Sequence, residues 1–464
     1  MIRVHDVLAG THGELLGDLS PNALLNRVVH DSRSVAAGDL FVAIHGEHLD
    51  GHAFIADAVE RGARAALVSA DWQQSLSELP VPLIVVPDTL QALQSLAAYW
   101  RGIFRLHVIG ITGSIGKTST KEVVAAVVGS KHVVQKSQGN FNNEIGLPLS
   151  VLDITPDSEV VVLEMGGAYA FGEIAQLAQI ARPDIGIVTN VTHSHLSRMG
   201  SLEAIAQTKV ELIESLPSHG VAILNIDDEL VRAMGDRANC RVVYYGLDPA
   251  ANLRAVNLES RGVDGTAFTL IRGGQENHLH IPLLGLHSVH AALAAFAVGY
   301  ELGMHLPDML RGLDTPEVQL RLLLTPGVNG STILDDHYNS NPKSSFAALA
   351  LLEDLTATRR VAVLGDMLEL GDYEEEGHRL VGRRLIDVVD ALYTLGPRAR
   401  IISEEAKSLK PSLPAFHFND KPALIEALTQ GLQPGDLVLV KGSRSLQMET
   451  VVADLRDESG QVRA

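Results

Sequence analysis

Short apolar runs alternate with helix-patterned stretches along almost all of the 464-residue chain. In the central part, the apolar runs predict strands over 107–111, 160–163 and 185–189, and a helix over 117–128 follows the first of them. Alternating strands and helices of this kind are typical of α/β domains whose sheets are mostly parallel. The chain is therefore expected to be an α/β protein.

Two proline-marked joints divide the pattern. Prolines between positions 80 and 87 surround one short apolar run, and Pro316 precedes a new β-rich stretch. Because domain boundaries fall in segments of this kind, we expect three units. Their predicted ranges are 1–82, 83–314 and 315–464.

Charged or polar residues follow directly after the predicted strands. Glu164 follows the strand over 160–163, Asp366 follows one predicted over 361–364, and Lys441 follows one predicted over 436–440. In open α/β sheets, ligands bind at the carboxyl ends of the strands. These positions are therefore candidates for a binding site.

The residues after the first central strand form a glycine-rich loop, Thr-Gly-Ser-Ile-Gly-Lys-Thr, at 112–118. A loop between a strand and a helix points backbone N–H groups at phosphates, and its glycines allow the tight turn. Lys117 supplies a charge for the terminal phosphates, and Thr118 can coordinate Mg²⁺. Ile111 stands where the common motif has its first glycine, so this loop is a variant. It predicts a nucleoside triphosphate site and leaves the reaction open.

Composition narrows the possible functions. The net charge of −19 argues against a nucleic-acid or anionic membrane surface. One cysteine, Cys240, excludes an internal disulfide and fits a reducing compartment. The N-terminus lacks a signal-peptide pattern, and no apolar run is long enough to span a bilayer. We therefore expect a soluble cytoplasmic protein whose partners are small molecules rather than nucleic acid or membrane.

Three positions are candidate metal ligands. Glu164 ends a strand and could hold a metal through its carboxylate, although an acid there could equally order the following loop. His193 and His195 form a His-x-His pair, a pattern that on its own leaves a metal role open.

Lys209 lies on the apolar face of a helix predicted over 202–216, which Ser201 can cap. The polar face of the same helix carries Glu203, Gln207, Glu211 and Glu214. A buried ammonium is costly without a partner, so the lysine needs an explanation. Its amine could reach the surface, pair with an acid or phosphate, or lose its proton and react with CO₂ to form a carbamate. The helix pattern alone leaves all three open.

Several motifs together resemble the Mur ligases, the ATP-dependent amide ligases of peptidoglycan synthesis. Around the phosphate loop, the matching segments are 112–121, 141–148 (Phe-Asn-Asn-Glu-Ile-Gly-Leu-Pro), 163–166 (Leu-Glu-Met-Gly) and 195–196 (His-Leu). Elsewhere they are 31–33 (Asp-Ser-Arg), 38–43, 50–52, 335–342 (Asp-Asp-His-Tyr-Asn-Ser-Asn-Pro), 365–371 and 440–445. The segments cover nearly the whole chain in the family's order.

The resemblance implies a small α/β N-terminal domain for a UDP-linked substrate, a central ATPase-type parallel sheet and a C-terminal Rossmann-like domain. The implied ATP-binding residues are Thr112, Gly113, Ser114, Ile115, Gly116, Lys117, Thr118, Ser119, Arg321, Asp335 and Asp336. The implied ligands of two Mg²⁺ ions are Thr118, Glu164, His195 and Lys209, the last as its carbamate. Lys117, Lys209, His195 and Arg321 are the implied catalytic residues. The implied substrate-binding residues are Ser32, Arg33, His52, Asn142, Asn143, Asn339, Asp366, Lys441, Ser443 and Arg444.

The signatures outside the ATP loop further imply the member that joins D-alanyl-D-alanine to UDP-N-acetylmuramoyl-tripeptide, as a monomer. The peptide carboxylate would be activated by ATP as an acyl phosphate, which the amine then attacks. No residue is a clear base for the amine, and His193 and Asp366 are the candidates. ATP contacts from two units also predict closure about a joint near Thr315.

Two departures from the family pattern are visible. The segment 285–291 reads Gly-Leu-His-Ser-Val-His-Ala, so Leu286, Ser288 and Ala291 stand where the family has an arginine and two asparagines near the adenine. His45 stands where a lysine is common. Two alternatives remain: another Mur-type or folylpolyglutamate-type amide ligase, and a catalytically silent binding relative.

Overall fold

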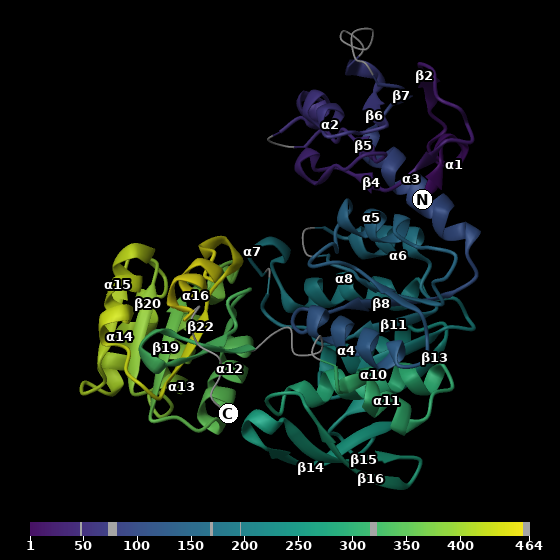
Figure 1. The fold of residues 1–464 in the computed structure, drawn as a ribbon. Helices are drawn as coiled ribbons and strands as arrows, with labels where there is room; N and C mark the ends of the chain where they lie inside the picture. Colours follow the sequence, from purple (N-terminus) through teal and green to yellow (C-terminus); the bar gives the residue numbers. More distant parts are fainter. Residues whose placement is uncertain (47–48, 73–80, 168–169, 195, 316–322, 458–464) are drawn as a thin grey trace.

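The computed structural model describes residues 1–46, 49–72, 81–167, 170–194, 196–315 and 323–457. The α/β class is confirmed, and the chain forms three sheet-centred units (Figure 1). No helix in these described ranges is long and apolar enough to cross a membrane.

The N-terminal unit is built on a five-stranded sheet in the order β2-β7-β6-β5-β4. Its strands are β2 (Glu14–Leu16), β4 (Val28–Val29), β5 (Leu40–Val42), β6 (Ala65–Ser69) and β7 (Leu83–Val86). Helices α1 (Val4–Thr11) and α2 (Ile55–Glu60) accompany it, and β1 (Ile2–Arg3) pairs with β3 (Leu24–Leu25). Strand β7 pairs with β6 and β2, so the run that we assigned to the middle unit belongs to the N-terminal sheet. A first boundary after Val86 therefore fits the sheet, in place of the predicted one after residue 82.

Helix α3 (Thr89–Ile103) leads from the N-terminal unit into the middle one. Asp88 caps it by accepting hydrogen bonds from the backbone N–H groups of Leu90 and Gln91 at 2.8 and 2.9 Å. Its apolar face packs against α1 on one side and α5 (Gly146–Leu152) on the other. One continuous apolar core therefore joins these two units.

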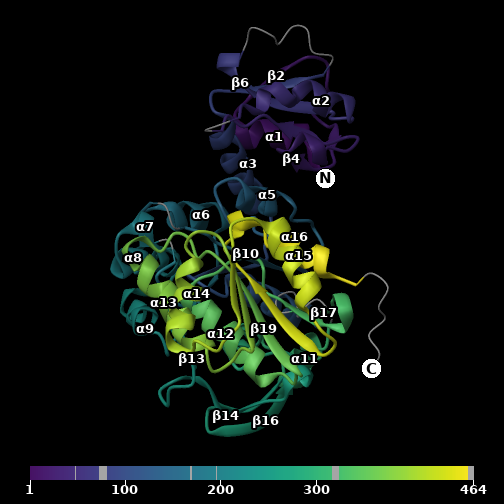
Figure 2. The ribbon, with the colours of Figure 1, turned by 90° about the vertical axis from the view of Figure 1, so that its left-hand side faces the viewer.

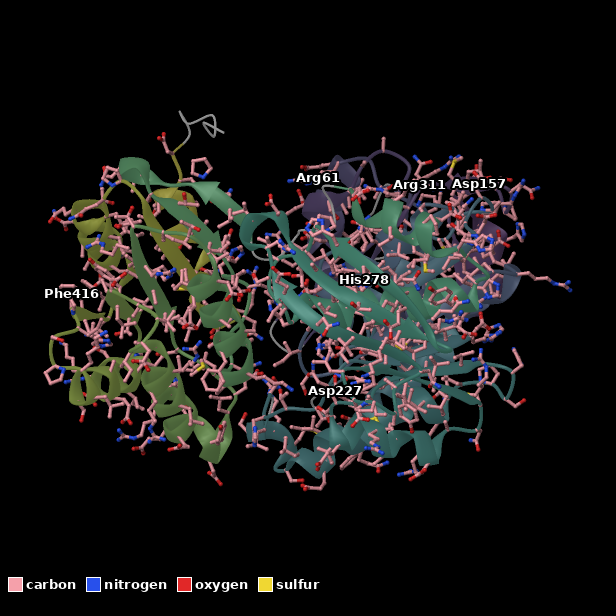
Figure 3. All side chains as sticks on the ribbon, turned by 90° about the horizontal axis from the view of Figure 1, so that it is seen from below. Arg61, Asp157, Asp227, His278, Arg311 and Phe416 are labelled. Atoms are coloured by element: carbon pink, nitrogen blue, oxygen red, sulfur yellow. The ribbon has the colours of Figure 1, made fainter. Side chains whose placement is uncertain are left out.

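The middle unit contains a nine-stranded sheet in the order β16-β15-β14-β13-β12-β11-β8-β10-β9. Its parallel strands are β8 (His107–Thr112), β9 (Val134–Lys136), β10 (Val160–Glu164), β11 (Ile185–Val188), β12 (Val221–Asn225), β13 (Arg241–Gly246) and β14 (Leu253–Ser260). Strands β15 (Thr266–Arg272) and β16 (Gln275–Ile281) extend it in antiparallel fashion. Figure 3 shows the molecule from below, with His278 labelled on this extension and Phe416 labelled on the C-terminal unit. The two labelled residues lie on separate units, well apart from each other. Strand order reverses around β8, and ligands bind at such a point in open α/β sheets.

Helices cover both faces of the central sheet (Figure 1). One face carries α4 (Lys117–Gly129), α10 (Ser288–Glu301) and α11 (Leu306–Leu313), whose apolar sides form one core cluster with the strands. The other face carries α5, α6 (Glu173–Ala181) and α8 (Leu202–Glu214). Shorter helices α7 (Leu196–Met199) and α9 (Glu229–Ala233) lie in connections at the sheet edge.

The C-terminal unit is a six-stranded sheet in the order β17-β18-β22-β19-β20-β21 (Figure 2). Its strands are β17 (Leu323–Pro326), β18 (Thr332–Asp335), β19 (Arg359–Gly365), β20 (Ala391–Leu395), β21 (Ala415–Phe418) and β22 (Asp436–Lys441). Helices α12 (Pro342–Asp354), α13 (Glu374–Leu385) and α14 (Arg400–Leu409) cover one face, and α15 (Lys421–Gly431) and α16 (Glu449–Leu455) cover the other. All pairs except β17–β18 are parallel, as expected for a Rossmann-like unit.

Candidate active site

The phosphate loop lies between β8 and α4, as predicted. Gly113 and Gly116 adopt φ values of +145° and +80°, a region that favours glycine. A Cβ atom on Gly113 would lie 1.9 Å from Thr189 Oγ1, so this position tolerates only glycine. The Lys117 ammonium donates hydrogen bonds to the carbonyls of Gly113 (2.7 Å) and Ser114 (3.4 Å), which folds it over the loop.

The segment after β11 holds the phosphate loop in place. Asn190 Oδ1 accepts a hydrogen bond from the N–H of Ile115 at 2.9 Å, and Asn190 Nδ2 donates to its carbonyl at 3.0 Å. Thr189 Oγ1 donates to the same carbonyl at 2.7 Å. The side chains of Thr189 and Asn190, which follow β11, therefore stabilise the conformation of the phosphate loop. Asn190 follows directly after the strand predicted over 185–189, a position that did not by itself indicate this role.

Glu164 lies at the carboxyl end of β10, directly beside the start of α4. Its carboxylate accepts hydrogen bonds from Thr118 Oγ1 and Asn142 Nδ2, each at 2.7 Å, and its side chain is 2 % exposed. Three residues predicted from separate motifs therefore meet at one point. Asn143 does not join them, because its Oδ1 accepts the N–H of Gly146 at 2.9 Å and orders the start of α5.

Lys121 is a buried positioning residue that the motif analysis did not single out. It is 0 % exposed, and its ammonium donates to the carbonyls of Ser137 (2.7 Å) and Gly139 (3.1 Å). Glu122 Oε1 lies 3.1 Å away and supplies the counter-charge. The contacts tie α4 to the loop that leads to Asn142. The available signal was the spacing, because a lysine four residues after Lys117 shares its helix face.

Lys209 is buried as the helix pattern predicted, at 3 % exposure. Its ammonium donates to the carbonyl of Gly167 at 3.3 Å, so the side chain does not reach the surface. Burial, with the positive charge of Lys117 nearby, lowers the pKa of Lys209 to about 7, against the opposing effect of Glu173 and Glu211. A sizeable fraction of this amine is therefore neutral near pH 7.

Glu211 departs from the predicted polar face of helix α8. It is buried, and its carboxylate accepts the backbone N–H groups of Gly172 (2.7 Å) and Ala175 (3.1 Å) at the start of α6. The prediction that Ser201 caps α8 is confirmed, because its Oγ accepts the N–H of Ala204 at 3.1 Å. The helix pattern could not reveal that a second helix packs over the Glu211 side.

The donor set at this edge fits Mg²⁺ and a lysine carbamate. Mg²⁺ takes hard oxygen ligands, which the Glu164 carboxylate and the Thr118 hydroxyl offer at hydrogen-bonding distance from each other. A neutral Lys209 amine can react with CO₂, and the product would add anionic oxygens. Within the described residues, no three His, Cys, Asp or Glu side chains gather into a metal site. His195 and Arg321 lie outside the described residues.

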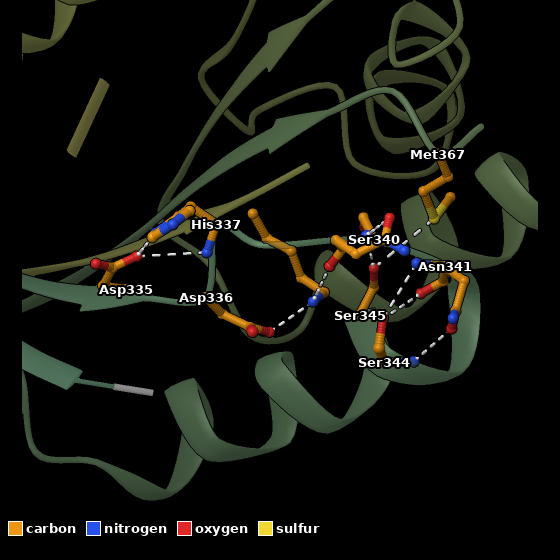
Figure 4. A network of polar contacts seen from close by, with 10 residues as sticks. Asp335, Asp336, His337, Ser340, Asn341, Ser344, Ser345 and Met367 are labelled. Carbon is orange, nitrogen blue, oxygen red and sulfur yellow. Dashed lines mark hydrogen bonds and ion pairs between the residues drawn. The ribbon is translucent and has the colours of Figure 1, made fainter. Parts of the chain in front are cut away.

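In the C-terminal unit, the predicted site residues form a network at the carboxyl end of β18 (Figure 4). Asp336 Oδ2 lies 2.6 Å from the buried Lys441 ammonium, which also donates to the carbonyl of Asn339 at 2.8 Å. Asp335 is buried and pairs with His337 at 2.5 Å and with Arg456 at 3.3 Å. Lys441 therefore orders the loop that carries Asp336 and Asn339. Their contacts with a nucleotide or substrate stay predictions.

Asp366 and Ser443 position backbone at the neighbouring strand ends. Asp366 Oδ1 accepts the N–H groups of Arg398 (2.9 Å) and Ala399 (2.7 Å), and the side chain is buried. Ser443 Oγ accepts the N–H of Leu368 at 2.8 Å. Arg444 is more exposed and pairs with Glu449 at 2.7 Å. Asp366, Ser443 and Arg444 were all predicted to bind substrate, and of these three only Arg444 keeps its polar group near the surface.

Comparison with known proteins places this geometry in a family. Three family models match the chain: "Mur ligase family, catalytic domain" over residues 25–101, "Mur ligase middle domain" over 111–299, and "Mur ligase, glutamate ligase domain" over 320–444. The chain is 37% identical over 457 residues to a UDP-N-acetylmuramoyl-tripeptide–D-alanyl-D-alanine ligase of Bacillus subtilis, covering 97% of this chain and 98% of the relative. The chain belongs to the Mur ligase family.

Other members of the family agree. The ligase of the same description from Escherichia coli is 35% identical, with 96% of both chains covered. The crystal structure of MurF from Acinetobacter baumannii superposes with a TM-score of 0.85 at 30% identity, covering 98% of both chains. MurF from Thermotoga maritima, solved in complex with ADP, gives a TM-score of 0.79 at 29% identity, covering 93% of this chain and 97% of that one. As a Mur ligase, the chain is an ATP-dependent enzyme.

A folylpolyglutamate synthase from Mycobacterium tuberculosis shares the fold, with a TM-score of 0.59 at 18% identity. It covers 79% of this chain, whereas the Mur ligases above cover more than nine-tenths. The likeness is therefore one of fold alone.

The N-terminal residues that the Mur ligase resemblance assigned to a UDP-linked substrate are partly occupied by local contacts. His52 is buried, with Nδ1 2.6 Å from Asp50 and Nε2 accepting the N–H of Ser69 at 2.9 Å. Arg33 is exposed and pairs with Asp31 at 2.7 Å, which holds the pKa of that carboxyl at about 2. Ser32 is buried beside them. Arg33 is thus the most accessible of the three.

The family's adenine region also differs in this chain. Leu286 is 39 % exposed, and Ser288 begins helix α10. Two residues further along, His290 Nε2 lies 2.8 Å from Asp227, whose carboxylate also accepts the N–H groups of Leu247 and Asp248. A histidine–aspartate pair therefore lies beside the position where the family's asparagine is absent.

Proposed function

We propose that this Mur ligase joins D-alanyl-D-alanine to UDP-N-acetylmuramoyl-tripeptide, with ATP hydrolysed to ADP and phosphate. The proposal rests on one observation, that the sequence similarity extends along the whole chain. Ligases of that description match all three units, including the N-terminal and C-terminal segments outside the phosphate loop. The product would be the UDP-linked pentapeptide precursor of peptidoglycan. A cytoplasmic monomer fits such nucleotide-linked substrates and the lone Cys240.

The reaction would proceed in two steps. In the first, an oxygen of the tripeptide carboxylate attacks the γ-phosphorus of ATP, the bond to the ADP oxygen breaks, and an acyl phosphate forms. In the second, the dipeptide amine attacks the carbonyl carbon, phosphate leaves with the bonding electrons, and the nitrogen loses a proton. The N–H groups of the phosphate loop and Lys117 would hold the phosphates in line for the first step.

Thr118, Glu164, His195 and carbamylated Lys209 would hold Mg²⁺, which neutralises the charge of the phosphates and the acceptor carboxylate when bound. Thr118 and Asn142 share the two oxygens of Glu164. Asn142 would thereby fix the orientation of the carboxylate. Arg321 and Asp336 would contact ATP from the C-terminal unit, as the family resemblance implies.

His193 is the better of the two candidates for the base that accepts the amine proton. The Asp366 carboxylate is buried and already accepts two backbone N–H groups. His193 instead lines a cavity of about 310 Å³ between the middle and C-terminal units, together with Lys343 and Phe346. The cavity is also lined by Thr192, whose N–H donates to Ser114 Oγ of the phosphate loop, so a dipeptide bound there would lie near the loop.

Phosphate release from ATP tests the proposal. Purified protein is given UDP-N-acetylmuramoyl-tripeptide and ATP, with D-alanyl-D-alanine present or omitted. The expected result is sustained release only when both acceptor and dipeptide are present. Release that ignores the dipeptide, or that requires glutamate and a folate instead, would overturn the assignment of substrates.

A further inference from the structure

A chain of hydrogen bonds runs from the C-terminal unit to the phosphate loop. Asn341 Nδ2 donates to Ser194 Oγ at 3.0 Å, and Ser194 Oγ lies 3.2 Å from Thr192 Oγ1. The backbone N–H of Thr192 then donates to Ser114 Oγ at 2.9 Å. Four residues from three separate segments are thus connected without a gap.

The helix cap of α12 fixes the direction of this chain. Asn341 Oδ1 accepts the N–H of Ser344 at 2.9 Å, which leaves its Nδ2 facing Ser194 (Figure 4 shows the cap). Ser194 Oγ accepts from Asn341 and also contacts Thr192 Oγ1, where either hydroxyl can be the donor. Ser114 Oγ accepts from the Thr192 N–H and donates its own proton to the Thr192 carbonyl at 3.4 Å. Thr192 and Ser114 therefore exchange hydrogen bonds in both directions, and the cap of α12 orients Asn341 at the other end of the series.

Neighbouring contacts also hold the loop after β11 against the C-terminal unit. The rings of His193 and Tyr373 stack with centroids 4.3 Å apart and planes 22° from parallel. The N–H of Ser197 donates to the carbonyl of Glu369 at 3.3 Å. The loop after β11 is therefore held between the phosphate loop on one side and the C-terminal unit on the other.

We infer that Asn341 and Ser194 are positioning residues through which docking of the C-terminal unit sets the phosphate loop for ATP. Neither residue needs to touch the nucleotide. When the C-terminal unit moves away, the Asn341–Ser194 bond is lost, and Thr192 loses the partner that orients its hydroxyl. The affinity for ATP then falls because the loop must be ordered by the nucleotide itself.

Two variants and their combination test this. Asn341→Ser keeps a residue that can cap α12 but is too short to reach Ser194, and Ser194→Ala removes the hydroxyl. One hydrogen bond of about 1 kcal/mol corresponds to roughly five-fold in affinity. We expect each variant to bind a non-hydrolysable ATP analogue about five-fold more weakly by calorimetry, and the double variant to be no weaker than either, because both remove one interaction.

Asp420→Ser is the matched control, because Asp420 caps α15 on the opposite face of the C-terminal sheet. It should leave ATP-analogue affinity unchanged. The KM for the UDP-linked substrate should stay within two-fold in every variant, which separates positioning of the phosphate loop from general damage.

If Asn341→Ser does not fold, Ser194→Ala alone still gives the five-fold test. Unchanged affinity in Ser194→Ala, or effects that multiply in the double variant, would overturn the inference. Analogue binding needs no peptide substrate, so it stands or falls separately from the proposed reaction.

Discussion

At the scale of single residues, Lys209 shows most clearly how burial changes chemistry. An ordinary lysine is neutral in about one molecule in three thousand at pH 7, whereas a pKa of about 7 makes roughly half of the Lys209 amines neutral. Carbamate formation consumes a neutral amine and CO₂ and releases a proton. The buried position therefore supplies the reactive form that the surface would not.

The pH dependence of the enzyme follows from this shift. Because the folded-state pKa lies below the value of 10.5 for an ordinary lysine, the unmodified folded protein binds fewer protons than the unfolded chain between about pH 7 and pH 10.5. Unmodified protein should thus become more stable as pH rises through that window.

In CO₂-depleted buffer, we expect activity to fall as pH drops below 7 and to recover with added bicarbonate, measured by phosphate release.

Lys209→Ala is the control for the bicarbonate effect. It should lose activity, ignore bicarbonate and regain part of the activity with a short carboxylic acid, which can occupy the place of the carbamate. An alanine variant with full activity would remove Lys209 from the site.

Gly113 gives a second test at this scale. Gly113→Ala places a Cβ 1.9 Å from Thr189 Oγ1 at a φ of +145°, so the loop must distort. We expect ATP-analogue affinity to fall by at least ten-fold, as measured by calorimetry. Gly129→Ala, at the last residue of helix α4 with no atom within 4 Å of the added Cβ, should bind normally and melt no lower. Normal binding by Gly113→Ala would show that the phosphate loop does not have this conformation when it holds ATP.

At the scale of elements, the sequence predicted the strands and helices that carry chemistry to within a few residues. The helix over 117–128 is found at Lys117–Gly129, and the strand over 160–163 at Val160–Glu164. Local periodicity and caps are enough for such elements. Pairing partners are not encoded locally, so the run Leu83–Val86 was placed in the wrong unit although its strand character was correct. Glu211 was misjudged for the same reason, since its partner helix is distant in the chain.

At the scale of elements, variants of Asp366 distinguish a positioning role from a catalytic role. Its Oδ1 joins the end of β19 to the backbone of residues 398–399. We expect Asp366→Ala to lower the free energy of unfolding by about 2 kcal/mol in urea titrations, because two N–H groups lose their acceptor. Asp366→Asn keeps an acceptor oxygen and should retain most of the stability and activity. A stable but inactive Asp366→Asn variant would instead identify the carboxylate as the amine base.

At the scale of the whole molecule, the site is shared between units. The sequence predicted the order of these units along the chain but not how they lie in space. The motifs predicted the phosphate loop, Glu164 and Lys209, and the structure brings them to one sheet edge. It adds Lys121, Asn190 and the Asn341–Ser194 contact, which arise from packing between segments far apart in the chain. The positions of His195 and Arg321 stay predictions from the family resemblance.

Closure of the C-terminal unit is the prediction that belongs to this scale. ATP contacts from both sides of the joint near Thr315 should draw the units together when nucleotide and acceptor bind. Small-angle scattering should therefore show a smaller radius of gyration with an ATP analogue and UDP-N-acetylmuramoyl-tripeptide than without them. The same radius in both states would contradict closure.

The central claim is that the three units together form one amide ligase with a dipeptide as its amine substrate. The most direct measurement is mass spectrometry of the product formed from UDP-N-acetylmuramoyl-tripeptide, ATP and D-alanyl-D-alanine, with phosphate counted in the same reaction. We expect a UDP-linked pentapeptide that contains the intact dipeptide, formed in equal amount to the phosphate released. Phosphate without a ligated product, or a product that carries a single amino acid, would contradict it.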